Sequence, residues 1–438
     1  MEIRDPIHGT LGVSRAETMV LDSPAFQRLR MIKQLGFSEF SFPGATHSRY
    51  LHSLGVSYLA GLAFDFIFKE FEFSSPQKRD LFRQVLRLSA LLHDIGHGPL
   101  SHTSEEVMPQ LSELKVKVYE KRKSAKTQDH LPYDGQRRAT HEDYTIKFIT
   151  DSHLTQILEK AFPDFEPFHI ASLIDKTLID KDDFFFDQGL NFRMILSQIV
   201  SSEVDVDRMD YLIRDAYFCG TSYGKVELNW LLGNFKPHIV ADRVHLALDR
   251  RALYTFDDFL LSRHHMYLMV YFHHKSIIYE EMLFRYLTSK NCLYKLPASI
   301  EDYVHFTDFS LYQDMAHSDN PWAKRISQRE SYKVLFENHV TSGSPRTEKL
   351  NLLLKEAGIE TITASSKSRL SKYHGLSPEE ESHEIFVVDP YDPHGKPVCI
   401  EECTEIFQKY EGARIIERVY VSPENIEMAR TLLKKLQF

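Results

Sequence analysis

The chain contains little cysteine and no long apolar run. No uninterrupted apolar stretch approaches the roughly 20 residues that a membrane helix requires, and the N-terminus lacks the charged-then-apolar pattern of a signal peptide. The cysteines are too sparse and too widely spaced for a disulfide framework or a CxxC pair; they are Cys219, Cys292, Cys399 and Cys403. These absences predict a cytoplasmic protein with reduced thiols that is neither exported nor inserted in a membrane.

An excess of basic charge is missing as well. The net charge of -9 argues against tight non-specific binding of nucleic acid as the main function. What the chain does have is length and ordinary globular composition, with 438 residues, 42% hydrophobic and 26% charged. That is enough to bury a sizeable core in one large domain with a smaller one attached.

The spacing of apolar residues divides the chain into two parts. Residues 23–287 predict mostly helices, because apolar residues recur at intervals of three and four in stretches such as 79–92 and 257–286. After about Gly343 the pattern predicts strands at 384–388, 397–400 and 414–421, followed by a helix at 423–436 that Ser422 can cap. We therefore expect a mainly α domain over residues 1–340 and a small α+β appendage over residues 341–438.

Residues 115–138 form a hydrophilic, mainly basic segment that Pro132 and Gly135 interrupt. We expect a mobile insertion in the large domain. A solvated loop is the simpler interpretation, and the functional one is a lid or clamp that attracts a polyphosphate or makes a weak contact with nucleic acid.

A His-Asp pair ends one of the predicted helices, in the sequence LLHDIGHG at residues 91–98. Such a dipeptide alone is weak evidence, because composition produces one or two by chance. Here the helix 79–92 would deliver His93 and Asp94 to a glycine-rich exit from the core. Burying an unpaired carboxylate costs several kcal/mol, so a bound cation explains this cluster better than packing does.

Two further segments carry candidate polar groups. In residues 204–215, helical geometry places Tyr211 about 40° and Asp215 about 80° around the axis from Asp207. The apolar residues between them imply burial rather than an ordinary solvated acidic helix. The other segment, residues 47–56, brings His52 into an apolar helix, where a lone histidine would more often be structural.

Taken in order, these motifs resemble the HD-domain phosphohydrolases. The motifs are HSRYLHSLGV at 47–56, LLHDIGHGPLSH at 91–102, HE at 141–142 and DVDRMDYLIRD at 205–215. The segments DPIHG at 5–9, FQRLR at 26–30, IKQLG at 32–36 and FPGA at 42–45 make the chain similar to the dNTP triphosphohydrolase branch, here without a SAM domain. The resemblance covers about residues 5–287 and implies that the large domain is an HD-domain helical bundle.

The resemblance also implies a metal centre and a catalytic group. The metal ligands would be His52, His93, Asp94 and Asp207, a mixed nitrogen and oxygen set that suits Mn²⁺, Fe²⁺, Mg²⁺ or Zn²⁺. A metal of this kind lowers the pKa of bound water and neutralises charge on a phosphate. The general acid would be His102, oriented by Glu105, with His97 and His141 flanking the phosphates.

The substrate and an activating nucleotide would contact further residues. Arg49 and Arg208 would grip phosphate oxygens. The sugar would meet Gln34, Leu35, Tyr211 and Asp215, with Phe272 where the family has a tyrosine. A regulatory GTP or dNTP would be held by Asp22, Gln27, Arg30, His274 and Lys275, and the resemblance implies a homodimer or homotetramer.

The predicted activity is therefore hydrolysis of dNTPs to deoxynucleoside and inorganic triphosphate, with the base left open. One alternative keeps the metal but changes the substrate to another nucleotide or to a nucleic-acid phosphoester, because one HD fold supports several such chemistries. Another is an inactive nucleotide-sensing scaffold, against which the intact His97, His102 and Glu105 argue.

Overall fold

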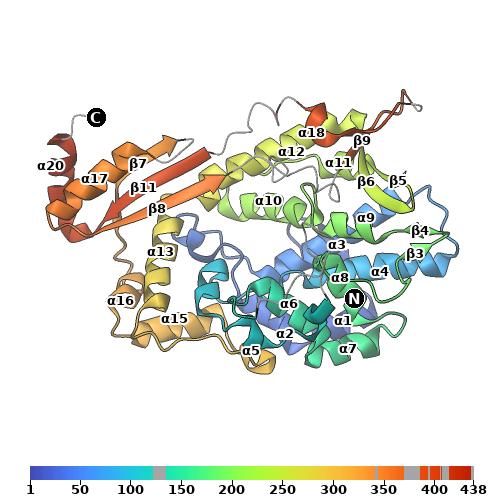
Figure 1. Ribbon diagram of the computed structural model, residues 1–438, viewed down its shortest axis with the longest axis horizontal. Coiled ribbons are helices and arrows are strands. Elements are labelled where there is room, and N and C mark those ends of the chain that lie inside the picture. Colours follow the sequence, from blue (N-terminus) through green and yellow to red (C-terminus); the bar gives the residue numbers. More distant parts are fainter. Residues whose placement is uncertain are drawn as a thin grey trace.

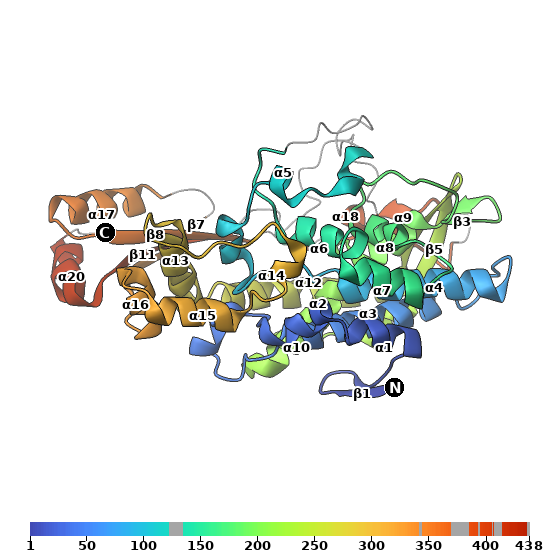
Figure 2. The ribbon, with the colours of Figure 1, turned by 90° about the horizontal axis from the view of Figure 1, so that it is seen from below.

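The structure, a computed structural model, describes residues 1–121, 135–340, 344–368, 385–392, 395–404, 406 and 414–435. Helices dominate it, and sheets lie toward both ends, with residues 333–340, 361–368 and 414–421 forming the sheet at one of them (Figures 1 and 2). The expected mainly α fold with a small α+β appendage is confirmed. Among the described residues, no helix is both long enough and apolar enough to cross a membrane.

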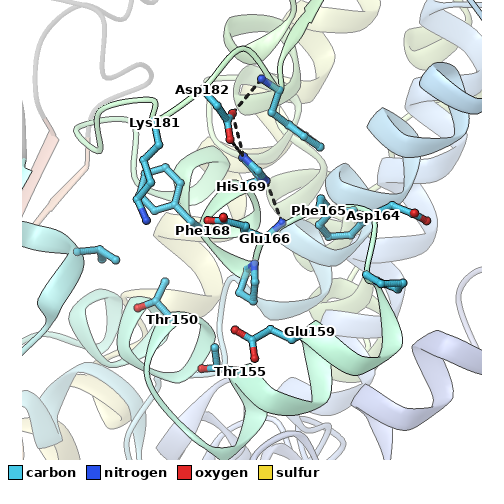
Figure 3. Close-up of a pocket in the computed structure, with 14 residues that line it drawn as sticks. Thr150, Thr155, Glu159, Asp164, Phe165, Glu166, Phe168, His169, Lys181 and Asp182 are labelled. Carbon is cyan, nitrogen blue, oxygen red and sulfur yellow. Dashed lines mark hydrogen bonds and ion pairs between the residues drawn. The ribbon is translucent and has the colours of Figure 1, made fainter.

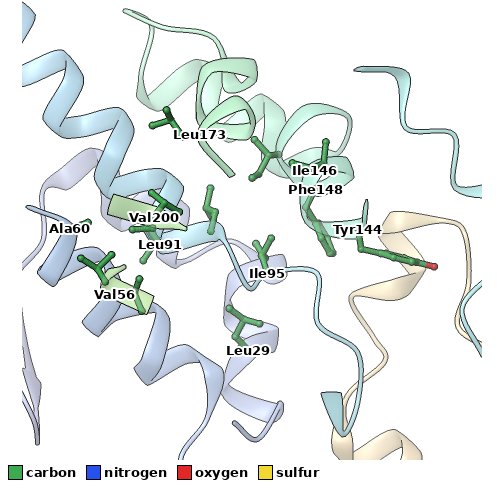
Figure 4. Close-up of a cluster of buried hydrophobic side chains, with 14 of the residues drawn as sticks. Leu29, Val56, Ala60, Leu91, Ile95, Tyr144, Ile146, Phe148, Leu173 and Val200 are labelled. Carbon is green, nitrogen blue, oxygen red and sulfur yellow. The ribbon is translucent and has the colours of Figure 1, made fainter. Parts of the chain in front are cut away.

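The centre of the helical part is α3 (Arg49–Ile67), which packs against α4 (Pro76–Leu92) and α10 (Val206–Cys219). Because α3 is apolar on nearly every side, it is buried along most of its length. The helix α4 begins at a Ser75 cap followed by Pro76, and its buried face ends at Leu92. Figure 4 shows Val56 and Ala60 of α3, Leu91 of α4 and Ile95 contributing to one buried cluster.

Further helices surround this centre. They are α1 (Arg15–Leu21), α2 (Pro24–Gln27), α5 (Leu111–Leu114), α6 (His141–Thr150), α7 (His153–Ala161), α8 (Pro167–Ile174), α9 (Arg193–Val200), α11 (Leu228–Gly233), α12 (Leu253–Met266), α13 (His274–Thr288), α14 (Ile300–Tyr303), α15 (Asp308–His317) and α16 (Pro321–Ser327). The predicted helix over 257–286 is interrupted by a π-helix at Tyr267–Tyr271, which separates α12 from α13.

The strands form a hairpin, a mixed sheet and an antiparallel sheet. The hairpin joins β1 (Glu2–Asp5) to β2 (Gly9–Gly12). The mixed sheet has the order β10-β9-β6-β4-β3, with β5 also paired to β6; its strands are β3 (Phe186–Asp187), β4 (Leu190–Asn191), β5 (Phe235–Val240), β6 (Arg243–Asp249), β9 (Phe386–Val388) and β10 (Val398–Cys399). The β5–β6 hairpin was not predicted, because β6 is buried at successive positions and lacks the alternation that identifies a half-exposed strand.

The antiparallel sheet has the order β7-β11-β8, formed by β7 (Lys333–Val340), β8 (Thr361–Ser368) and β11 (Arg414–Val421). The helices α17 (Pro345–Glu356) and α20 (Ile426–Lys435) pack on it through a separate small core that includes Leu350, Val419 and Ala429. The short helix α18 (Ile400–Cys403) follows β10. The predicted C-terminal strands thus divide between two sheets, and β7, which precedes the predicted boundary at 340, pairs with β11.

Residues 122–134, most of the predicted mobile insertion, lie outside the described residues. The described parts on either side contact the helical part. Lys117 Nζ lies 3.0 Å from Asp151 Oδ1, and Arg137 pairs with Asp143 at 2.7 Å. The mobility of the insertion stays a prediction, as do the domain boundaries.

Candidate active site

The predicted metal ligands meet where α3, α4 and α10 come together. His52 lies in α3, His93 and Asp94 follow the last turn of α4, and Asp207 lies in the first turn of α10. Asp207 Oδ1 is 3.0 Å from His52 Nε2 and 3.5 Å from His93 Nε2. Asp94 completes the group, with carboxylate oxygens 3.8 Å from His52 Nε2 and 3.3 Å from His93 Nε2. Packing of three helices thus gathers side chains that are far apart in the sequence.

The two imidazoles in this group present Nε2 to the carboxylates. His52 Nδ1 is 2.8 Å from Asp210 Oδ2, and His93 Nδ1 is 2.8 Å from the Ala90 carbonyl oxygen, so each Nδ1 carries a proton that it donates. Both Nε2 atoms are buried and have no hydrogen-bond partner within the described part of the chain. Two buried ring nitrogens without a hydrogen-bond partner, beside two carboxylates, fit a divalent cation.

The charges of the group also suit a cation. Burial alone would raise the pKa of Asp207, but His52 and His93 hold it well below its usual range. Burial likewise opposes ionisation of Asp94, and His93, Arg49 and His97 outweigh it and keep the pKa of this carboxyl low. Burial would lower the pKa of His52, whereas the carboxylates of Asp207 and Asp210 raise it to about 10. A cation at Nε2 would therefore displace a proton from His52.

A second group of histidines adjoins the first. Glu105 Oε1 accepts hydrogen bonds from Nδ1 of His102 at 3.1 Å and from Nδ1 of His141 at 2.6 Å. The ring of His97 stacks on that of His141 with centroids 3.8 Å apart, and His97 Nε2 lies 3.4 Å from Asp94 Oδ1. Burial opposes ionisation of Glu105, but the two donors lower its pKa to about 2, so it is an anion at neutral pH.

This histidine group offers donor atoms within 4.8 Å of one another, which is close enough to consider a second cation. The rings of His97 and His141 are nearly parallel, at 18°. Stacked imidazoles direct their in-plane lone pairs alongside each other, whereas ligands of one ion converge. Burial, together with the charge of Arg49, lowers the pKa of His97 well below its usual value and keeps it neutral. The geometry suits neighbouring oxygens of a phosphate better than a second metal.

The predicted phosphate-binding arginines differ in their surroundings. Arg49 is buried, hydrogen-bonds Asp94 through Nη1 and donates to Ser101 Oγ at 2.8 Å. Its Nε has no hydrogen-bond partner within the described residues. Arg208 Nη1 is engaged by the carboxylate of Asp205 and the carbonyl oxygen of Ser202. Arg49 therefore lies within the metal group, while Arg208 is largely held by its own loop.

The residues predicted to meet the sugar are linked by two residues that the sequence analysis did not assign. The Gln34 N–H donates to the His47 carbonyl oxygen at 3.0 Å, and His47 Nε2 is 2.7 Å from Asp215 Oδ1. Tyr271 donates its hydroxyl proton to Asp215 Oδ2 at 2.8 Å, and its ring lies 6.1 Å from that of Tyr211. Gln34, Tyr211 and Asp215 thus belong to one network.

Leu35 and Phe272 do not take part in these hydrogen bonds. Leu35 follows Gln34 and packs against the core, whereas the Phe272 ring lies edge-on to Tyr267 at 5.5 Å. Tyr271, one position earlier, is the last residue of the π-helix and donates to Asp215 instead. The sequence does contain a signal for Tyr271. A tyrosine precedes the His274-Lys275 pair, but one residue earlier than the position at which the family has its tyrosine.

The residues predicted to bind a regulatory nucleotide come from two separate stretches of the chain, 22–30 and 274–275. Asp22 follows α1 and is exposed, Gln27 ends α2, and Arg30 donates from Nε to Gln27 Oε1 at 2.8 Å. His274 and Lys275 begin α13. Their role in binding a nucleotide stays a prediction.

A cavity of about 680 Å³ beside α7 and α8 contains none of the predicted site residues (Figure 3). Its histidine, His169, accepts from the Glu166 N–H at 3.1 Å and pairs with Asp182 at 3.2 Å. Because both ring nitrogens already have partners, we interpret this side chain as structural.

Comparisons with known proteins agree with this geometry. The family model of the HD domain matches residues 49–215, and that of the HD associated region matches residues 238–362. Uncharacterized protein YwfO of Bacillus subtilis is 30% identical over 87% of this chain and 83% of its own length. The chain belongs to the HD-domain family, as the resemblance indicated, and is a phosphohydrolase of the kind that binds divalent metals.

Within that family the chain is similar to deoxynucleoside triphosphate triphosphohydrolases. The SAMHD1 protein of Gallus gallus, which carries that name, is 27% identical over 83% of this chain and 59% of its own length. The crystal structure of a hypothetical protein from Aquifex aeolicus superposes with a TM-score of 0.73, at 25% identity and with 99% of each chain covered.

Proposed function

We propose that the protein hydrolyses dNTPs to deoxynucleoside and inorganic triphosphate with one divalent ion held by His52, His93, Asp94 and Asp207. The observation that carries the proposal is that Nε2 of both histidines is buried, without a hydrogen-bond partner in the described residues, and turned toward the two carboxylates. When bound, Mn²⁺, Fe²⁺, Mg²⁺ or Zn²⁺ would lower the pKa of water and polarise the α-phosphate.

The phosphate chain would lie against the neighbouring histidines and Arg49. His97 and His141 offer side-by-side donors, and Arg49 adds a fixed positive charge next to Asp94. Donors arranged in this way match several oxygens of one polyphosphate. Arg208 would contribute mainly by its charge, because its guanidinium already bonds Asp205.

His102 would supply the proton for the leaving group. Water attacks the α-phosphorus, the bond to the 5′-oxygen breaks, and His102 Nε2 protonates that oxygen, so that deoxynucleoside and triphosphate are released. Two features support this role. The Glu105 carboxylate holds His102 by Nδ1, which leaves Nε2 free to donate, and the His102 side chain is 73% exposed and can reach a substrate.

The deoxyribose would be held by Gln34, Leu35, Tyr211 and Asp215. Support comes from Gln34 Oε1, which is buried and has no hydrogen-bond partner within the described residues, and therefore offers an acceptor to a sugar hydroxyl. The name of the SAMHD1 relative supports dNTP hydrolysis. Regulation by GTP or a dNTP at Asp22, Gln27, Arg30, His274 and Lys275, and assembly as a homodimer or homotetramer, are further parts of the proposal.

The test is incubation of the purified protein with Mn²⁺ and each dNTP, alone and mixed, with products separated by chromatography. We expect deoxynucleoside and triphosphate in equal amounts, and none after chelation of the metal. Release of orthophosphate or pyrophosphate would contradict the proposal. Activity confined to cyclic nucleotides, alarmones or nucleic-acid ends would favour the other HD chemistry, and binding without turnover would favour a nucleotide sensor.

A further inference from the structure

Asp210 is a buried carboxylate that none of the roles above uses, although it lies three residues after Asp207 in α10. Its Oδ2 accepts from His52 Nδ1 at 2.8 Å and from Arg214 Nε at 2.8 Å. Its Oδ1 accepts from His8 Nε2 at 2.6 Å and from Arg214 Nη2 at 2.9 Å. Four donors thus fix this carboxylate directly behind a predicted metal ligand.

The turn between β1 and β2 supplies part of this support. Arg214 donates from Nη1 to Asp5 Oδ2 at 2.8 Å, while Asp5 Oδ1 accepts the backbone N–H groups of Ile7 at 2.9 Å and of His8 at 2.8 Å. The segment Asp5–Gly9, noted in the sequence only for its resemblance, therefore presents Asp5 to Arg214 and His8 to Asp210. Asp5 and Arg214 are both buried.

The helix α3 is shaped to admit the same carboxylate. A Cβ atom added at Gly55 would lie 2.0 Å from Asp210 Oδ1 and 2.4 Å from Arg214 Nη2. Only glycine lets α3 approach α10 this closely. His52 is one turn before Gly55, so the close approach also brings its Nδ1 within hydrogen-bond distance of Asp210.

We propose that Asp210 is the positioning residue of the metal centre, and that the Asp5–Gly9 turn holds Asp210 in place. By accepting the Nδ1 proton, Asp210 fixes the tautomer and ring orientation of His52 and leaves the Nε2 lone pair directed at Asp94 and Asp207. His93 is oriented differently, by the Ala90 carbonyl oxygen. This inference rests on the proposed metal centre and adds residues that act on it through His52.

The test is the Mn²⁺ affinity of Asp210→Asn, measured by competition with a chelator. The amide keeps the shape of the carboxylate but can donate to His52 Nδ1, which favours the wrong tautomer. We expect Mn²⁺ to bind more weakly by roughly 10- to 100-fold, as when other metal-bound histidines lose the group that accepts their second ring N–H. The matched control is Asp187→Asn. Asp187 is also a buried, hydrogen-bonded carboxylate, but its partner is Ser74, so this variant should keep the wild-type Mn²⁺ affinity.

A spectroscopic measurement separates orientation of His52 from a general loss of packing. The visible absorption of bound Co²⁺ reports ligand geometry, and we expect it to change in Asp210→Asn and to stay unchanged in Asp187→Asn. If Asp210→Asn does not fold, His8→Leu decides, because leucine cannot donate to Asp210 Oδ1 and the variant should bind Mn²⁺ several-fold more weakly.

Wild-type Mn²⁺ affinity and an unchanged Co²⁺ spectrum in folded Asp210→Asn would overturn the inference. If Asp210→Asn does not fold, wild-type Mn²⁺ affinity in folded His8→Leu would overturn it. Failure of the wild-type protein itself to bind Mn²⁺ would contradict the proposed function and, with it, this role of Asp210. The two failures are therefore distinguishable.

Discussion

The hydroxyl of Tyr271 donates a 2.8 Å hydrogen bond to Asp215 Oδ2, across a gap of more than fifty residues in sequence. Tyr271 is the last residue of the π-helix Tyr267–Tyr271, which lies between α12 and α13 and has a wider turn than an α-helix. Asp215 is held from the other side by His47 at 2.7 Å. The carboxylate predicted to meet the sugar is thus fixed in one orientation.

Tyr271→Phe removes only the hydroxyl that fixes Asp215. We expect kcat/KM for dNTPs to fall by about 10-fold, because one hydrogen bond contributes roughly 0.5–1.5 kcal/mol net and the freed carboxylate can turn away from the sugar. Steady-state kinetics with each dNTP and the ribonucleotide of the same base measure this change in kcat/KM. The same kinetics on Phe272→Leu show which of the two adjacent aromatic residues supports activity. A larger fall in kcat/KM in Phe272→Leu than in Tyr271→Phe would contradict this account of the sugar contacts.

His102→Ala should lower kcat by about 10² or more while leaving metal content and thermal stability unchanged. The side chain is 73% exposed, so its removal opens no cavity in the core. Single-turnover rates with elemental analysis of the same samples check both expectations. Glu105→Gln should show a smaller loss, since it weakens the anchor of His102 but leaves the imidazole. Full activity in His102→Ala would remove this residue from the mechanism.

Glu280 gives the protein a stability that depends on pH. Burial, with the nearby charge of Glu281, raises the pKa of Glu280 to about 7. Because an unfolded glutamate titrates near 4.3, the folded state holds this proton more tightly, and the stabilisation is present below about pH 4 and lost as the pH rises through 7. Glu280→Gln should therefore stabilise the protein by about 1–3 kcal/mol at pH 8 and by much less at pH 5.

Denaturant unfolding at the two pH values measures this difference. Glu356 is exposed and supplies the control. Glu356→Gln should change the free energy of unfolding only slightly, and by the same amount at pH 5 and pH 8. A gain in Glu280→Gln that is the same at pH 5 and pH 8 would show that the ionisation of Glu280 is not its cause.

The helices and the residues of the metal group could be predicted from the sequence more completely than the strands and the contacts between distant elements. Apolar periodicity predicted the helix 79–92, and the structure has α4 at Pro76–Leu92, ending just before His93. Motif order then predicted that His52, His93, Asp94 and Asp207 would be near one another, and the structure brings them within 3.8 Å or less of a neighbour in the group.

What the sequence could not indicate depends on contacts between distant elements. The strand β6 is buried at successive positions and so lacks alternation, and its partner β9 lies more than 130 residues away. In the sequence, nothing distinguishes Asp210 from the other acidic residues of α10. Its role depends on its contacts with His8, His52 and Arg214, which only the structure shows. Tyr271 was missed because the resemblance placed Phe272 at the position of the family's tyrosine, whereas the structure has Tyr271 donating to Asp215.

The metal content of Asp207→Ala tests the central claim most directly. Asp207 is the one predicted ligand from α10, and it lies 3.0 Å from His52 Nε2 and 3.5 Å from His93 Nε2. With Asp242→Ala as the exposed control, elemental analysis after dialysis should find one divalent ion per chain in the wild type and the control, and less than about a tenth of that in Asp207→Ala. Stoichiometric metal in folded Asp207→Ala would contradict the four-ligand centre.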